Sequence, residues 1–306
     1  MLDICLAGTA GMVPLPDRWL TTLYAASEGS SVLIDCGEGT QIALAEAKCR
    51  LKTIDAICLT HFHADHCAGL PGLLLSMGNA GREDPVTIVG PTGLRQVLAG
   101  LLVIAGGVGF DVAACEIDPD GSEIKDGYVK AGPMTIRAFR AEHVVPCLGY
   151  TISIERRPEF LPEKAEALGI PREYWKVLQS GKPVTVNGTS FVPGAVTGPQ
   201  RPGIKVLYST DTRPVKSIAE HGKGADLMIL EGNYPDEEKI DKAKEWGHMT
   251  YKEAASLAAQ AGARELWLTH FSQSVSDPSE YLENAASVFP NTVIGKDGLK
   301  KTLVFR

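Results

Sequence analysis

The segment His61-Phe62-His63-Ala64-Asp65-His66 constrains the fold of this chain more than any other part of its sequence. It follows an apolar stretch, residues 54–59, that predicts a buried strand, and it leads into an apolar stretch, residues 66–77, that predicts a helix. Imidazole and carboxylate groups on such a turn can converge on one point, and Zn²⁺ favours these ligands in proteins. We therefore expect a metal centre here, in preference to a plain helix start that Asp65 caps.

The other candidate site residues also lie next to predicted strands or helices. His143 and His270 each follow a predicted strand, Asp211 follows another, and His248 precedes a predicted helix. Side chains at strand ends can meet at one edge of a sheet, so we expect these four to join the segment at residues 61–66. His221, near the end of a predicted helix, is interpreted as an ordinary surface residue.

Strands and helices alternate along the 306 residues, which predicts helices packed outside a sheet core. Both halves of the chain repeat the pattern of a strand with a polar cluster at its end, which indicates two related sheets packed face to face. The length suffices for one large core. We expect a single domain over residues 1–306.

Residues 156–203 interrupt this alternation, because they are rich in proline, glycine and charge. They contain two helix-like pieces, residues 163–168 and 173–179, and one short strand candidate, residues 184–186. From Arg156 to Lys205 there are eight basic and four acidic residues, a local charge of +4. We interpret the segment as a protruding arm that could bind phosphates. The alternative is a solvated surface insertion.

The overall composition limits the class of protein further. A net charge of −7 argues against a generally basic nucleic-acid surface but leaves a local basic patch open. The seven cysteines are scattered, odd in number and without a CxxC pair, which favours reduced thiols. No signal-peptide pattern follows Met1, and the longest apolar run, residues 97–110, is too short to span a bilayer. We expect a cytoplasmic protein with no membrane partner.

Several further motifs accompany the histidine segment in a recognisable order. They read IDCGEGTQ at 34–41, GLPGLL at 69–74, STDTRP at 209–214 and THFS at 269–272. Together these motifs resemble the metallo-β-lactamase superfamily and, within it, the ribonuclease Z family of tRNA 3′-processing endonucleases, over essentially the whole chain. The resemblance implies an α/β (α+β) fold, the αββα sandwich of two mixed sheets with outer helices.

The resemblance also implies a set of site residues with two Zn²⁺ per chain, for which Mn²⁺ or Fe could substitute. The implied ligands of one zinc are His61, His63 and His143. The implied ligands of the other are Asp65, His66 and His270, with Asp211 as the bridging carboxylate. Asp65 would also orient the nucleophile. His248 is similar to the family's non-ligand catalytic histidine, and Glu231 is similar to the residue that orients it.

The activity implied by the resemblance is removal of 3′ trailers from precursor tRNA, by a homodimer in which each arm serves the partner's site. Two other functions stay open: a small-molecule phosphodiesterase or lactonase-like hydrolase, and a non-catalytic metal-dependent binding protein. A complete ligand set beside His248 argues against the binding protein. A proton donor favours phosphodiester cleavage, because lactam or lactone hydrolysis needs less help at the leaving group.

The sequence departs from the family pattern outside the metal ligands. Glu231 is preceded by Leu230 and followed by Gly232-Asn233, and the first loop reads Gly-Thr-Ala-Gly-Met at residues 8–12. In the arm, Arg172-Glu173 stand where the family has Gly-Pro, and residues 178–182 have lost one lysine. These departures bear on the affinity for tRNA and leave the implied metal ligands unchanged.

Overall fold

The computed structural model describes residues 1–118 and 128–306, and these form two compact units. The larger unit comprises Met1–Ile154 and Ile204–Val304. The smaller unit comprises Glu155–Gly203 and the last two residues. No helix in the described ranges is long and apolar enough to cross a membrane.

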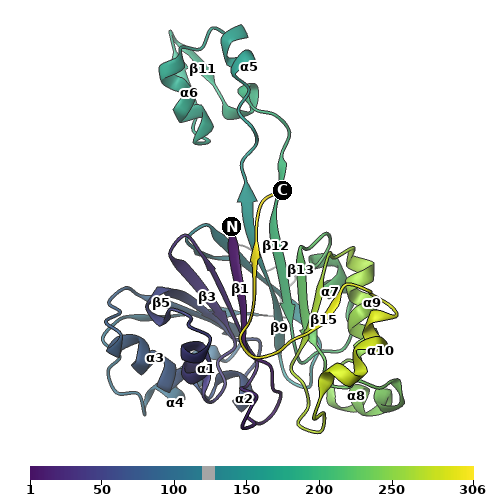
Figure 1. Ribbon diagram of the computed structural model, residues 1–306. Coiled ribbons are helices and arrows are strands. Elements are labelled where there is room, and N and C mark those ends of the chain that lie inside the picture. The colour runs from purple at the N-terminus through teal and green to yellow at the C-terminus, as the bar shows by residue number, and fades with distance from the viewer. Residues whose placement is uncertain (119–127) are drawn as a thin grey trace. The chain divides into compact units, whose positions relative to one another are not determined.

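The first sheet of the larger unit has seven strands in the order β16-β1-β2-β3-β4-β5-β6 (Figure 1). Its strands are β1 (Leu2–Gly8), β2 (Thr22–Ser27), β3 (Ser30–Ile34), β4 (Ile54–Cys58), β5 (Val86–Pro91), β6 (Val112–Ile117) and β16 (Leu299–Leu303). Strands β3 to β6 run parallel, whereas β16, β1, β2 and β3 pair antiparallel. The sheet is therefore mixed.

The second sheet is also mixed and has the order β15-β14-β13-β12-β9-β8-β7. Its strands are β7 (Tyr128–Ala131), β8 (Met134–Ala141), β9 (Cys147–Arg156), β12 (Arg201–Ser209), β13 (Leu227–Glu231), β14 (Leu266–Thr269) and β15 (Thr292–Ile294). Strands β12 to β15 run parallel, and β7, β8 and β9 pair antiparallel. Each sheet thus places a set of parallel strand ends at one edge.

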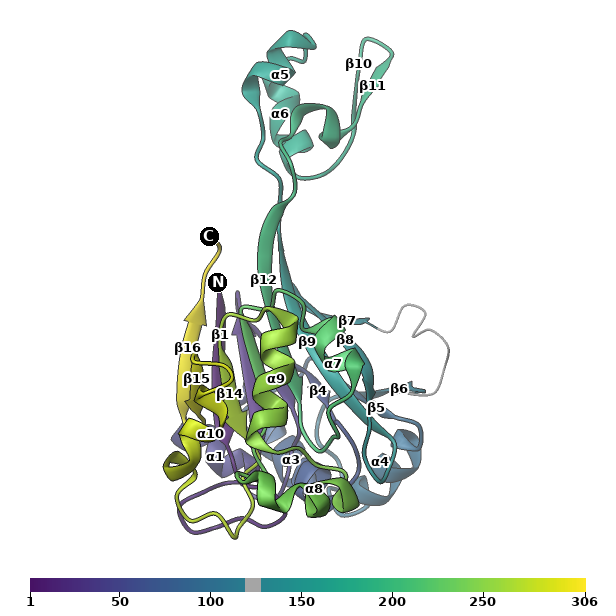
Figure 2. The same ribbon diagram turned by 90° about the vertical axis from the view of Figure 1, so that its right-hand side faces the viewer.

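Helices cover the outer faces of both sheets (Figures 1 and 2). The first sheet is covered by α1 (Thr40–Glu46), α3 (Leu70–Asn79) and α4 (Leu94–Leu102), and the second by α7 (Lys216–His221), α9 (Tyr251–Ala261) and α10 (Leu282–Ala286). The described residues of this unit also form α2 (Ala64–Cys67), α8 (Ile240–Trp246), η1 (Leu51–Thr53), η3 (Glu237–Lys239) and η4 (Pro278–Tyr281). This arrangement confirms the αββα sandwich expected from the sequence.

Three hydrophobic cores separate the four layers. On β1, Leu2, Ile4 and Leu6 pack between the two sheets, whereas Cys5 and Ala7 pack toward the helices of the first sheet. Successive side chains of a strand point to opposite faces, so a strand buried on both faces needs an unbroken apolar run. That requirement explains why fully buried strands such as β13 and β14 are apolar runs without polar alternation.

One expected helix is wrong in its extent. The helix predicted over residues 66–77 is two helices, α2 and α3, separated at Ala68-Gly69. The Gly69 amide donates to the Cys36 carbonyl at 2.9 Å, and a Cβ on Gly69 would lie 1.9 Å from the Gly37 oxygen. The chain must turn here because the 36–37 backbone lies directly against it.

The smaller unit has its own secondary structure and core. It contains α5 (Pro162–Ala167), α6 (Arg172–Gln179), the hairpin of β10 (Val184–Val186) and β11 (Thr189–Phe191), and η2 (Pro193–Val196). These elements confirm the two helices and the strand predicted within residues 156–203. The buried residues are Ala165, Ile170, Leu178, Val184 and Val196. The basic residues Lys164, Arg172, Lys176 and Lys182 are exposed, and Arg172 forms an ion pair with Glu166 at 3.2 Å.

Candidate metal centre

The candidate site lies where parallel strands of both sheets end. Asp35 follows β3, Asp211 follows β12 and His270 follows β14. All three have left-handed backbone, with φ of 63°, 53° and 57° respectively. Such φ values are uncommon for residues with side chains and cluster at functional sites, where the surrounding structure holds them. The strand ends thus turn sharply and present their side chains to one place.

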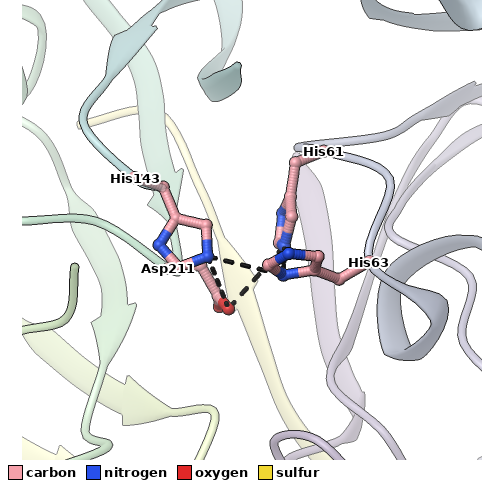
Figure 3. A group of neighbouring side chains, drawn as sticks. All are labelled: His61, His63, His143 and Asp211. Atoms are coloured by element: carbon pink, nitrogen blue, oxygen red, sulfur yellow. Dashed lines mark hydrogen bonds and ion pairs between the residues drawn. The ribbon is translucent and has the colours of Figure 1, made fainter. Parts of the chain in front are cut away.

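The first group of candidate ligands comprises His61, His63, His143 and Asp211 (Figure 3). His61 Nε2 lies 2.9 Å from His63 Nδ1, and His143 Nε2 lies 3.4 Å from the same atom. Asp211 Oδ2 lies 3.8 Å from His61 Nε2 and 3.9 Å from His143 Nε2. The four ligand atoms all lie within 4.8 Å of one another, which is the spacing of groups around one ion.

The second group comprises Asp65, His66 and His270. The Nε2 atoms of His66 and His270 are 3.2 Å apart, and Asp65 Oδ2 lies 3.4 Å from the first and 3.5 Å from the second. Asp211 presents its other oxygen here, with Oδ1 2.9 Å from His270 Nε2 and 3.5 Å from His66 Nε2. Asp211 therefore faces both groups, one oxygen toward each.

The hydrogen bonds around two of the rings test whether the cluster suits a cation. His66 Nδ1 lies 2.9 Å from a carboxylate oxygen of Asp35, and His143 Nδ1 lies 3.1 Å from the Gly247 carbonyl. Both partners can only accept, so each Nδ1 carries a proton, and in its neutral form each ring turns the Nε2 lone pair inward. The lone pairs meet carboxylate oxygens, which are also acceptors. Nitrogen lone pairs that face carboxylate oxygens need a cation between them, which a metal ion can supply. A hydrogen bond that fixes the other ring nitrogen is also typical of metal-binding histidines.

The charges of the cluster favour the same occupant. Burial alone would lower the pKa of His66, but the carboxylates of Asp211 and Asp35 raise it well above its ordinary value. Burial likewise opposes a charged His270, whereas Asp211 raises the pKa of that ring to about 10. Burial would raise the pKa of Asp65, yet its bonds with His270 and His66 hold it well below its usual range. The buried carboxylates thus attract positive charge, which a divalent metal supplies.

Asp35 is a site residue for which the sequence analysis assigned no role. Its buried carboxylate accepts from the Thr60 amide at 2.8 Å, the Thr60 hydroxyl at 2.9 Å, His66 Nδ1 at 2.9 Å and the Tyr208 hydroxyl at 3.3 Å. It therefore fixes the ring of His66 without facing the ligand atoms. Asp35 belongs to the motif at residues 34–41, which was the available signal.

Replacing Asp35 with Asn should weaken metal binding by about 10- to 100-fold, the usual effect of losing a group that orients a ligand. The side-chain NH₂ of Asn is itself a donor, so it could not accept the hydrogen bonds that the four groups around Asp35 donate. Competition with a chromophoric zinc chelator measures the affinity. Asp241→Asn, on an exposed carboxylate of α8, is the matched control and should retain wild-type affinity. Equal affinity of the Asp35 and Asp241 variants would rule out the orienting role.

A histidine–carboxylate pair lies beside the two groups. His248 Nδ1 is 3.0 Å from Glu231 Oε2, and the His248 ring lies 5.2 Å from that of His143 and 5.9 Å from that of His270. Glu231 is fully buried and also accepts from the amides of Thr212 and Met249. The carboxylate thus holds the proton on Nδ1 and leaves Nε2 to exchange a proton with a ligand.

Arg213 and Glu253 hold the backbone on which His248 lies. The Arg213 guanidinium donates to the His248 carbonyl and to both carboxylate oxygens of Glu253. Glu253 also accepts from the Thr250 amide, which closes a capping box at the start of α9. These two residues were missed by the sequence analysis, although Arg213 belongs to the motif at 209–214. Their hydrogen bonds join the segment that follows Asp211 to the segment that carries His248.

The structure brings the nine predicted site residues together. They are His61, His63, Asp65, His66, His143, Asp211, Glu231, His248 and His270. His221 lies elsewhere, on α7, where its ring stacks on Phe139 at 4.8 Å. The distances show that these residues lie close together. Their roles as metal ligand, bridge, proton donor or orienting residue stay predictions.

Comparisons with known proteins agree with this geometry. A family model described as "Metallo-beta-lactamase superfamily" matches residues 20–223, and one described as "Beta-lactamase superfamily domain" matches residues 179–271. The chain is 50% identical over 306 residues to a protein named ribonuclease Z from Lachnoclostridium phytofermentans, and 48% identical over 305 residues to one from Agathobacter rectalis. Each alignment covers 100% of this chain and 99% of the relative.

A solved structure of similar fold is the short form of human tRNase Z, with a TM-score of 0.72 and 24% sequence identity. The match covers 99% of this chain and 100% of that one. Identity of this order supports the fold, whereas the 40–50% identity to the bacterial relatives over full length identifies the family. The chain belongs to the ribonuclease Z family of the metallo-β-lactamase superfamily.

Proposed function

We propose that this protein is a metal-dependent endoribonuclease that removes 3′ trailers from precursor tRNA and leaves a 3′-hydroxyl on the tRNA. The observation that carries the proposal is the His248–Glu231 pair, 3.0 Å apart, directly beside the cluster of metal-ligand residues. Cleavage of an RNA diester expels a poor leaving group, which benefits from a proton donor. The bacterial relatives named ribonuclease Z support the same substrate.

The proposal includes two Zn²⁺ per chain, with Mn²⁺ or Fe as substitutes. His61, His63 and His143 would hold one ion, Asp65, His66 and His270 the other, and Asp211 would bind both. The separate approach of the two Asp211 oxygens to the two groups supports this division. Bound zinc supplies Lewis acidity toward the phosphoryl oxygens and makes water a nucleophile at neutral pH.

The chain's own residues would complete the reaction. Asp65 belongs to the second group and also accepts a hydrogen bond from the Met12 amide at 2.8 Å, and from this position it would orient the attacking water. When the bond between phosphorus and the 3′-oxygen of the tRNA breaks, that oxygen needs a proton. His248 Nε2 would donate it, while Glu231 stabilises the charged ring.

A precursor tRNA with a 3′ trailer, incubated with the zinc-loaded protein beside bis(p-nitrophenyl) phosphate, tests the proposal. A single cut after the discriminator base, mapped by primer extension, would support it. Hydrolysis of the small diester without any cut in the RNA would instead indicate the small-molecule phosphodiesterase. Chelation with EDTA should abolish both reactions.

The proposal extends to the assembly and its location. The smaller unit would be an arm that binds tRNA, in a cytoplasmic homodimer where each arm serves the partner's site. Its exposed basic residues, Lys164, Arg172, Lys176 and Lys182, support phosphate binding. Light scattering on the purified protein measures the oligomeric state.

Deleting the arm should abolish precursor cleavage but retain hydrolysis of the small diester, because the arm has a core of its own. The chain offers a clean point of deletion. Arg156 and Arg157 present carbonyls to the side chains of Gln200 and Arg201, each at 2.8 Å. Residues 158–199 can therefore be replaced by Asn-Gly, which favours a tight hairpin turn.

A second variant separates charge from folding in this prediction. Replacing Lys164, Arg172, Lys176 and Lys182 with Ala keeps the arm but removes its exposed charges. We expect weaker precursor binding with a shallower dependence on salt, because fewer counterions are released. Wild-type precursor cleavage by the deletion variant would contradict the role of the arm.

A further inference from the structure

The first loop, which follows β1, runs directly against the second group of candidate ligands. The Gly11 amide donates to the Phe271 carbonyl at 3.0 Å, and a Cβ on Gly11 would lie 2.7 Å from the His270 ring. The next amide, that of Met12, donates to Asp65 Oδ2 at 2.8 Å. Met12 is therefore fixed within one hydrogen bond of a candidate metal ligand.

The backbone at Met12 adopts a conformation that favours glycine. Its φ is 68°, and the Val13 amide donates to the Gly11 carbonyl at 2.9 Å across it. A three-residue turn with positive φ at its centre is a classic γ-turn, which is rare and strained. The bonds of Gly11 and Met12 to Phe271 and Asp65 hold the strain in place, as is common where a chain contacts a ligand.

The side chain of Met12 is exposed despite this fixed backbone. Its exposed fraction is 62%, and that of Val144, which follows His143 of the first group, is 60%. Val144 also lines a cavity of about 220 Å³ together with His143. An exposed apolar side chain thus adjoins each of the two ligand groups, where it can contact an apolar face of a ligand.

We propose that Met12 contacts the nucleobase next to the scissile phosphate. This inference rests on the proposed function, since it requires RNA as the substrate. A phosphate at the cluster carries one nucleoside on each side, and unpaired bases bind by apolar contact with side chains. The methionine thioether is flexible and polarisable and packs well against aromatic rings.

A double-mutant cycle between enzyme and RNA tests the contact. The RNAs are a precursor tRNA, the same RNA abasic at the nucleotide 5′ of the scissile phosphate, and the same RNA abasic at the nucleotide 3′ of it. The enzymes are the wild type, Met12→Gly and Glu28→Gly. Glycine suits the φ of Met12 and keeps its amide. Glu28 is an exposed residue of the β2–β3 turn with φ of 51°, so Glu28→Gly makes the same backbone change elsewhere.

We expect one abasic RNA to lower kcat/KM of the wild type by about 2- to 10-fold, the range for contacts between sulfur and an aromatic ring. The same abasic RNA should not lower kcat/KM of Met12→Gly, and it should lower kcat/KM of Glu28→Gly as much as that of the wild type. Filter-binding measurements of Kd, in a His248→Ala background that does not cleave, should show the same coupling. Equal losses for the wild type and Met12→Gly with both abasic RNAs would overturn the inference.

Two checks keep the outcome unambiguous. Met12→Gly should melt no lower than the wild type, because glycine relieves a strained position; if it melts lower, Met12→Asn is used, since Asn tolerates positive φ. If the wild type does not cut the precursor at all, the proposed function fails. If it cuts the precursor and the cycle shows no coupling, only the role of Met12 fails.

Discussion

His248→Ala should reduce precursor cleavage by about 10²- to 10⁴-fold, the usual contribution of a positioned proton donor. His248 lies within ligand distance of Asp211 and His270. Metal content should nevertheless stay at the wild-type level, because the two proposed ions have their own ligand groups and His248 Nδ1 is bonded to Glu231. Single-turnover cleavage and elemental analysis of the same preparation measure the two quantities. Full loss of metal would instead make His248 a ligand.

The leaving group provides a specific control for this prediction. The p-nitrophenolate of bis(p-nitrophenyl) phosphate departs without a proton, whereas the 3′-oxygen of RNA requires one. His248→Ala should therefore lose much less activity on the small diester than on the precursor. His221→Ala, which changes a histidine on α7, should lose neither activity. Equal losses on both substrates would remove the proton-donor role.

The pH dependence follows from the same pair. Burial lowers the pKa of His248, but the charge and hydrogen bond of Glu231 raise it above the ordinary value of 6.5. The acid form is active, so cleavage should be retained below this raised pKa and lost as the pH rises through it. In Glu231→Gln the charge is absent, and the loss should occur at lower pH. A basic limb of kcat/KM that stays in place in this variant would contradict the assignment.

The sequence predicted the candidate ligands because their signals are local. Residues 61–66 carry four ligand groups on one turn, and His143, Asp211 and His270 each follow a strand whose apolar run is visible in the sequence. The ends of parallel strands share an edge of the sheet, so strand order alone brings such residues together. Their division into two ligand groups came from the family resemblance.

The supporting residues could not be predicted in the same way, because their contacts join distant parts of the chain. Asp35 reaches His66 across 31 positions, and Arg213 reaches Glu253 across 40. The break between α2 and α3 depends on the approach of Gly69 to Gly37, which no helical periodicity records. Motif membership marked Asp35 and Arg213 as unusual, but only the three-dimensional contacts show what they hold.

Asp211→Asn should reduce precursor cleavage by about 10³-fold or more, since bound metal contributes several kcal/mol to such reactions. The change retains the size of the side chain but removes the charge that faces both ligand groups. Burial would raise the pKa of Asp211, and the neighbouring His270 and His66 hold it well below its usual range. It is therefore ionised at neutral pH, when metal binds.

Thermal melting with and without added zinc separates metal loss from other effects of Asp211→Asn. A ligand that binds only the folded state adds about 2.7 kcal/mol of stability at 100 times its Kd, so zinc should raise the Tm of the wild type. It should raise the Tm of Asp277→Asn, an exposed control, equally. In Asp211→Asn the shift should vanish for both ions, because the carboxylate faces both groups. A shift half as large, with one zinc retained, would mean that Asp211 serves only one group and is not the bridge.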